Sequence, residues 1–158
     1  MARELITSWS DYQAATERLL GLAGESISIY DEDLAALGLG SAARLDTLQH
    51  LLKRGQGLAL RIAVRNAAPL RQHEPGLLRL LTVFSHRAAA RQTPEHLAHL
   101  RDGMLIVDDR HALIRFDRDQ ARSKLLIDEA DELRPYLARF DEIWAEGGEP
   151  VTATALGL

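Results

Sequence analysis

Two short apolar runs separated by a helical pattern constrain the fold of this chain more than any other feature of its sequence. Residues 26–30 alternate with a period of two and are rich in β-branched side chains, which is typical of a strand. Residues 58–64 are mostly apolar, which indicates a central strand. Between the two runs, Ser41 is a good N-cap for a helix whose leucines fall on one face. A strand, a helix and a strand in this order predict a right-handed crossover that joins a parallel pair.

Helical patterns also lie on either side of this unit. We predict a first helix over residues 10–23, which Ser10 begins with a capping box, and a short leucine-rich helix over residues 76–84. Residues 69–74 between the second run and the short helix read as a loop. The last helix ends at Gly147-Gly148, and its apolar stripe consists of Leu133, Leu137, Phe140, Ile143 and Trp144.

Four further segments have the pattern of strands, namely residues 88–92, 104–107, 112–116 and 124–127. The second and third are separated only by residues 108–111, so they form a hairpin. The order of elements predicts an α/β fold in which one mixed sheet is flanked by helices. At this length we expect a single domain over residues 1–158.

The composition excludes several classes of site. The chain has no cysteine, which rules out disulfides and thiolate zinc sites and favours the cytoplasm. Its start lacks the apolar stretch of a signal peptide, and no segment is apolar enough for a membrane span. The formal net charge of −4 argues against broad electrostatic binding of nucleic acid.

A glycine-rich pattern and an acidic run follow the first predicted strand, and we interpret both as loop features. Gly38, Gly40 and Ala43 have the spacing of a dinucleotide site, but the acidic segment 31–37 separates them from the strand. We interpret them as a loop and a helix cap. The acidic run 31–33 is interpreted as a solvated loop, with cation binding as the alternative.

Histidines and arginines are the remaining candidates for a site. His96 and His99 are three apart, and a metal site would need Glu95 or Asp102 as a third ligand, so we expect surface histidines, no metal and no cofactor. Arginines flank and follow the second apolar run, beginning with Arg61. They are either scattered and solvated or converge on an anion, which guanidinium groups bind in bidentate fashion.

Residues 104–114 resemble part of the phospholipase D superfamily. Active members carry His-x-Lys, four residues and Asp, with the aspartate closing an apolar strand before a hairpin. Asp108 takes the aspartate place, Gly103 the lysine place and Arg101 the histidine place. The small Gly-Ser pair that usually ends the next strand falls on Arg115 and Phe116.

The resemblance implies that this chain lacks catalytic residues. In the family the histidine is the nucleophile and the lysine helps to hold the phosphate. Glycine has no side chain, and a guanidinium stays protonated and cannot attack phosphorus. A phosphodiesterase with an altered site, using His99 or His96, is the alternative. A His99-x-Arg101 pair would fit the motif only if Asp102-Gly103 is an insertion.

A wider resemblance covers nearly the whole chain. It is similar to an uncharacterised proteobacterial domain of phospholipase D-like fold, found alone or attached to GNAT-type acetyltransferases. The segments that carry this similarity are 26–34, 60–64, 77–80, 106–109, 140–144 and 156–158. The resemblance implies a phospholipase D-like half-domain, and therefore a homodimer, since active members build one site from two halves.

We therefore expect a non-catalytic binding or regulatory module. Its expected ligand is phosphate-containing or otherwise anionic, and an acetyltransferase is the alternative partner. The expected ligand-binding residues are Arg101, Asp108, His99, Arg61 and Arg115.

Overall fold

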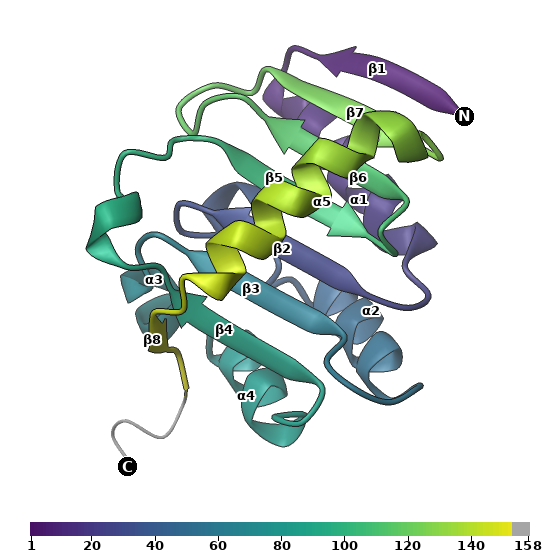
Figure 1. The fold of residues 1–158 in the computed structure, drawn as a ribbon. Coiled ribbons are helices and arrows are strands. Elements are labelled where there is room, and N and C mark those ends of the chain that lie inside the picture. Colours follow the sequence, from purple (N-terminus) through teal and green to yellow (C-terminus); the bar gives the residue numbers. More distant parts are fainter. Residues whose placement is uncertain (153–158) are drawn as a thin grey trace.

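A mixed sheet of eight strands forms the centre of residues 1–152, which the computed structural model describes (Figure 1). The strands follow one another across the sheet in the order β1 (Ala2–Ile6), β7 (Ser123–Ile127), β6 (His111–Arg115), β5 (Gly103–Val107), β2 (Ile27–Asp31), β3 (Leu60–Val64), β4 (Ala88–Gln92) and β8 (Glu149–Pro150). β2, β3 and β4 are parallel, and every other pair is antiparallel.

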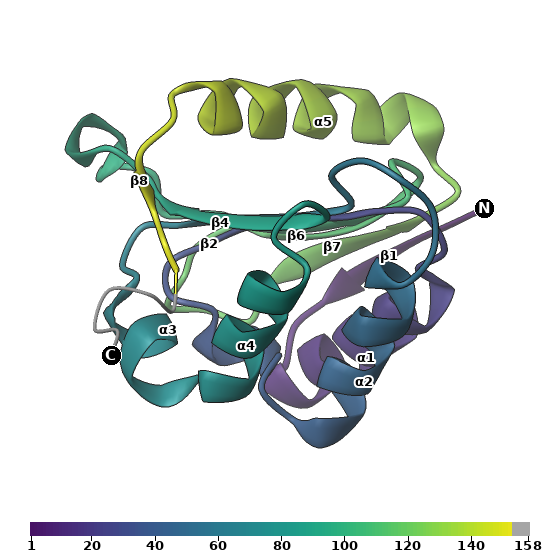
Figure 2. The ribbon, with the colours of Figure 1, turned by 90° about the horizontal axis from the view of Figure 1, so that it is seen from below.

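Helices cover both faces of the sheet (Figure 2). One face carries α1 (Trp9–Leu22), α2 (Ala42–Leu52), α3 (Ala68–His73) and α4 (Pro75–Val83), and α5 (Ala130–Ala145) crosses the other face alone. Short 3₁₀ turns lie at η1 (Ala35–Leu37) and η2 (Glu95–Leu97). The expected α/β fold with one mixed sheet between helices is confirmed, and so is the parallel crossover from β2 through α2 to β3.

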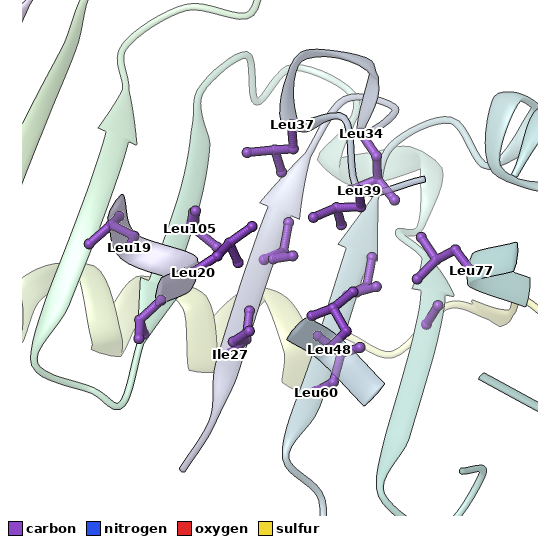
Figure 3. Close-up of a cluster of buried hydrophobic side chains, with 14 of the residues drawn as sticks. Leu19, Leu20, Ile27, Leu34, Leu37, Leu39, Leu48, Leu60, Leu77 and Leu105 are labelled. Atoms are coloured by element: carbon purple, nitrogen blue, oxygen red, sulfur yellow. The ribbon is translucent and has the colours of Figure 1, made fainter. Parts of the chain in front are cut away.

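The larger core lies between the sheet and helices α1 to α4. Figure 3 shows leucines of α1, α2 and α4 beside the strands. The strand residues Ile27, Leu60 and Leu105 in this core are each at most 1% exposed. Burying one such side chain contributes about 1.5–3 kcal/mol. Because β5 is buried on both faces, its near-continuous apolar sequence follows from its central position.

A smaller core lies under α5. Leu133, Phe140 and Ile143 of its predicted stripe are buried against the sheet, and Leu137 and Trp144 pack at its margin. Gly147 and Gly148 have positive φ values where the chain leaves the helix, as expected of a glycine stop. Within residues 1–152, none of the helices combines the length and apolarity that a bilayer crossing requires.

Some expected boundaries are wrong. The cap of α1 is Ser8, whose Oγ accepts a hydrogen bond from the Asp11 N–H, rather than Ser10. The expected loop over 69–74 is mostly α3, because Pro69 suits a first turn and Leu70 is fully buried.

The sequence reading omitted both edge strands, β1 and β8. In β1, Arg3, Glu4 and Leu5 are exposed, and two of these three residues are charged. β8 has only two residues. Neither strand therefore shows an apolar alternation. The resemblance at 156–158 lies outside the described residues.

Candidate functional site

The candidate site lies where β2 ends, β5 begins and β6 ends. Tyr30 pairs with Met104 across β2 and β5, and Gly103 pairs with Arg115 across β5 and β6. This register brings Asp31, Gly103 and Arg115 to one edge of the sheet, on the face that α1 covers.

Arg115 and Asp31 form a buried ion pair at this edge. Arg115 Nη2 donates to Asp31 Oδ1 at 2.6 Å, and each side chain is 2% exposed. Arg115 Nη1 reaches the Tyr12 hydroxyl at 3.4 Å, and the guanidinium lies 5.3 Å from the Tyr12 ring and 5.7 Å from the Trp9 ring. Arg115 Nε is buried without a hydrogen-bond partner among the described residues.

Asp31 is also tied to its own loop. Its Oδ2 accepts hydrogen bonds from the N–H of Leu34 at 2.8 Å and of Asp33 at 3.3 Å. Leu34 adopts a left-handed backbone with φ 72°, which is uncommon for a leucine. Burial raises the pKa of Asp31, whereas Arg115 and the two N–H donors favour its charged form and lower it. Burial likewise raises the pKa of Tyr12 to about 12.

Gly103 leaves the space that this ion pair fills. A Cβ atom at Gly103 would lie 2.9 Å from Asp31 Oδ1 and 3.5 Å from Arg115 Nη2. A side chain leaving β5 at this position would therefore run into the ion pair. The positive charge at this end of the strands is therefore the Arg115 guanidinium of β6, and β5 contributes no side chain at Gly103.

Arg101 lies at the same end of the sheet but faces the loop after β6. It donates to both carboxylate oxygens of Asp117, at 2.9 and 3.1 Å, and to Asp119 at 2.6 Å. These hydrogen bonds lower the pKa of Asp117 to about 2. The Arg118 N–H also donates to the Arg101 carbonyl at 2.7 Å, so Arg101 holds this loop in place.

Asp108 lies at the opposite end of β5. Its carboxylate accepts hydrogen bonds from the backbone N–H groups of Gly24, Glu25 and Ser26, at 2.7 to 3.2 Å. These residues precede β2, so Asp108 joins the β5–β6 turn to the start of its neighbouring strand. Its role in this structure is to satisfy backbone donors.

The other two expected ligand-binding residues lie elsewhere. Arg61 is on the α5 face, where it donates to Ser28 Oγ at 3.0 Å and lies 4.8 Å from the Phe140 ring. His99 is exposed between η2 and β5. Arg101 and Arg115 thus lie at one end of the β5–β6 pair, and Asp108 lies at the other.

Asp31 is the site residue that the sequence reading missed. Its interpretation as part of a solvated loop is wrong, because it is 1% exposed. The sequence carries one related signal. Gly103 stands where the motif has a lysine, and Arg115 stands where the next strand usually has a glycine, so a cation is lost at one position and gained at its neighbour.

The two acidic residues expected as a third metal ligand, Glu95 and Asp102, are paired with arginines instead. His96 Nε2 lies 2.7 Å from Glu146, while Asp102 is paired with Arg139 and Glu95 with Arg65. Within the described stretch, no three histidine or acidic side chains lie close enough together to hold a metal ion.

Comparison with known protein families identifies the family of this chain. Residues 8–155 match the family described as a domain of unknown function, DUF7931. The chain belongs to this family. No curated protein sequence matches the DUF7931 chain.

Solved structures similar to this DUF7931 domain establish its fold. Nuc of Salmonella typhimurium, a phospholipase D family member, is 12% identical with a TM-score of 0.64, and NucT of Helicobacter pylori is 11% identical with a TM-score of 0.61. In both cases the match covers 96% of this chain and 98% of the other. The domain therefore has a phospholipase D-like fold.

A third similar structure has another role. TrmBL2, described as an archaeal chromatin protein with a novel mode of DNA binding, is 16% identical with a TM-score of 0.70. The match covers 96% of this chain but 54% of TrmBL2, so the DUF7931 chain spans about half of that protein.

Proposed function

We propose that this chain is a non-catalytic binding or regulatory module of phospholipase D-like fold. The observation that carries the proposal is the buried Arg115–Asp31 pair beside Gly103. At the lysine place there is no side chain, and the space next to it is filled. At the histidine place, the Arg101 guanidinium is held by two carboxylates and stays protonated, so it has no lone pair for attack on phosphorus.

Hydrolysis assays on the purified chain test this proposal. With bis(p-nitrophenyl) phosphate and with a fluorescent single-stranded oligonucleotide, we expect no turnover above that of buffer. An altered-site phosphodiesterase would instead show turnover that is lost on His99→Ala or His96→Ala. His73→Ala is the matched control, because it removes an exposed imidazole at the end of α3, outside the segment that leads into β5.

The DNA-binding description of TrmBL2 makes duplex DNA a second ligand to test. A small anion is favoured here, because Arg101, Arg118 and Arg139 are each paired with carboxylates of the chain itself, and the net charge is −4. We expect no change in the fluorescence anisotropy of a labelled duplex at physiological ionic strength. Salt-dependent binding of the duplex at micromolar protein concentration would mean that nucleic acid, and not a small anion, is the ligand.

We also propose that two copies associate near this site. Leu5 and Phe116 are 56% and 43% exposed, and with the charged residues Arg3, Glu4 and Lys124 they line an open hollow of about 410 Å³. Covering these side chains would remove apolar surface from water. Sedimentation velocity at micromolar concentration should show a dimer, and Phe116→Ser should shift it toward monomer. A monomer at all accessible concentrations would remove this part of the proposal.

A further inference from the structure

The two edges of the sheet differ in how they are protected. At one edge, β8 has only two residues, one of which is Pro150, and it follows Gly147 and Gly148, which have positive φ values. A short strand and a proline keep a sheet edge from pairing with another chain. At the other edge, β1 extends over five residues, and no strand lies beyond it among residues 1–152 (Figure 1).

β1 lacks the features that usually protect an edge. It contains no proline, and it pairs with β7 in one unbroken register, so it has no bulge. Both of its charges have partners within the chain, because Arg3 lies 3.2 Å from Glu132 and Glu4 lies 3.4 Å from Arg18. Leu5 is 56% exposed. An open strand of this kind is a template for another strand.

A hollow lies on each side of this edge. On the α1 side, a hollow of about 310 Å³ is lined by residues of β1, α1 and β7, and its charged members are Glu4, Asp11 and Arg18. On the α5 side lies the open hollow that Leu5 and Phe116 line. Because successive side chains of a strand point to opposite faces, a strand added to β1 would place its side chains alternately over the two hollows.

The charges on the α1 side are arranged so that a second copy of the chain complements them. α1 begins soon after β1 ends and runs back along it, so Asp11 lies near the end of β1 and Arg18 lies beside Glu4. A two-fold axis through Glu4 would reverse the direction of the second strand. Arg18 of each copy would then lie toward Asp11 of the other copy.

Pairing about this axis has a defined register. The axis is normal to the sheet, so each residue pairs with one that points to the same face. Glu4 would lie opposite Glu4 of the second copy and Arg3 opposite Leu5, so that all five residues of β1 pair. The aliphatic part of Arg3 would cover the exposed Leu5, and Arg18 would offset the repulsion between the two Glu4 carboxylates.

We propose that the β1 edge binds the β1 edge of a second copy in antiparallel orientation, which joins the two sheets into one. This inference rests on the association proposed above and names its surface. Because the paired strands run in opposite directions, the Arg115 ends of the two sheets point away from each other. Each copy therefore keeps its own site, in contrast to the assembly of one site from two halves.

Single cysteines test this register, since the chain has no cysteine of its own. Opposed residues of an antiparallel pair have Cα atoms about 4.5–5.5 Å apart, which a disulfide can bridge. Under mild oxidation, Glu4→Cys should therefore form a disulfide-linked dimer almost completely. Leu5→Cys should not, because diagonal neighbours lie about 7–8 Å apart. Leu22→Cys, at the exposed end of α1, is the matched control and should stay monomeric on a non-reducing gel.

The contact between Arg18 and Asp11 has its own test. Arg18→Ala should raise the dimer dissociation constant in sedimentation by about three- to tenfold, as expected for an exposed ion pair. Arg54→Ala, in the exposed loop after α2, is the matched control and should leave this constant unchanged. An equal effect of the two variants would contradict the contact.

A measurement on the parent chain decides the matter if Glu4→Cys does not fold. Raising the protein concentration through the range of dimerisation should slow amide hydrogen exchange in β1 and leave exchange in β8 unchanged. Unslowed exchange in β1, or no disulfide at Glu4→Cys in a chain that sediments as a dimer, would overturn the β1 interface and leave association itself intact. A monomer at all concentrations would remove both, and hydrolysis of phosphodiesters is a separate readout, so the failures are distinguishable.

Discussion

Asp108 and Asp109 adopt the same backbone conformation but have different roles. Both have left-handed φ values, 56° and 53°, in a tight turn closed by the Arg110 N–H to the Val107 carbonyl at 3.0 Å. Consecutive left-handed residues are typical of hairpin turns, because their twist matches that of the paired strands. Only Asp108 also accepts N–H groups from the segment before β2.

This pair supports a prediction with an internal control. Asp108→Ala should lower the free energy of unfolding by about 2–4 kcal/mol. The variant lacks the carboxylate that accepts hydrogen bonds from the N–H groups before β2, and alanine is strained at a positive φ. Asp109→Ala carries only the strain and should cost about 1 kcal/mol. Urea unfolding monitored by circular dichroism measures both. Equal losses would mean that the hydrogen bonds of Asp108 contribute little.

Arg115 and Asp31 should be strongly coupled in stability. Arg115→Met leaves a buried carboxylate unpaired and should cost about 3–5 kcal/mol at neutral pH. Combining it with Asp31→Asn should recover part of that loss, because the amide is neutral and still offers an oxygen to Leu34. Additive losses in urea unfolding would contradict the coupling.

The cost of Arg115→Met should also depend on pH. Burial already raises the pKa of Asp31, and removing Arg115 takes away the main effect that opposes it. A carboxyl with a raised pKa in the folded state favours folding when protonated, so its contribution falls as pH rises above the unfolded value. The loss should therefore be smaller at acidic pH than at pH 7. A loss that does not change between these conditions would mean that Asp31 stays ionised in the variant.

At the scale of the elements, the start of α1 shows that a sequence pattern can indicate the wrong cap residue. Ser8 and Ser10 both precede or begin an apolar helical pattern, and only Ser8 has the extended backbone and the Asp11 N–H of an N-cap. Ser8→Ala should cost about 1 kcal/mol, because one helix donor loses its acceptor. Ser10→Ala should be neutral or slightly stabilising, since alanine favours a helix interior. Thermal unfolding of the two variants measures the difference, and the reverse order would place the cap at Ser10.

The same element also connects local structure to the site. Trp9 and Tyr12 lie in the first turns of α1, and both rings lie within 6 Å of the Arg115 guanidinium. The position of the cap sets where the helix begins and hence where these rings point. A helix beginning two residues later would leave Trp9 outside it.

At the scale of the whole molecule, two tyrosines report on the two cores. Tyr12 packs in the core beneath α1, and Tyr30 packs in the core beneath α5. Burial is the main cause that raises the pKa of each to about 12 from 10.0. Because the unfolded chain ionises its tyrosines first, stability should be fully present below pH 10 and should fall as pH rises toward 12.

Variants separate the contributions of the two faces. Denaturant unfolding between pH 9 and pH 12 should show a smaller alkaline loss in Tyr12→Phe and in Tyr30→Phe than in the parent. Absorbance of tyrosinate in the folded chain follows the ionisation directly. A parent chain whose stability does not change over this range would contradict the raised pKa values.

How much could be predicted differs between central and edge elements. The crossover through α2, the β5–β6 hairpin and α5 follow from local apolar periodicity, and each agrees with the structure. β1 and β8 are held by pairing with β7 and β4, so their own sequences carry little signal. The short α3 is stabilised by the burial of Leu70, which depends on distant residues.

The sequence by itself determined the α/β pattern, the turn at Asp108 and the absence of the motif's histidine and lysine. These properties depend on residue identity and on contacts that are close along the chain. Tertiary structure alone decided that Asp31 is buried, that Arg115 pairs with it and that Arg101 turns to Asp117. Asp31 and Arg115 are 84 residues apart, so only the register of β2, β5 and β6 brings them into contact. Their burial removes competing water, which strengthens the attraction between the two charges, while the cost of desolvating them opposes it.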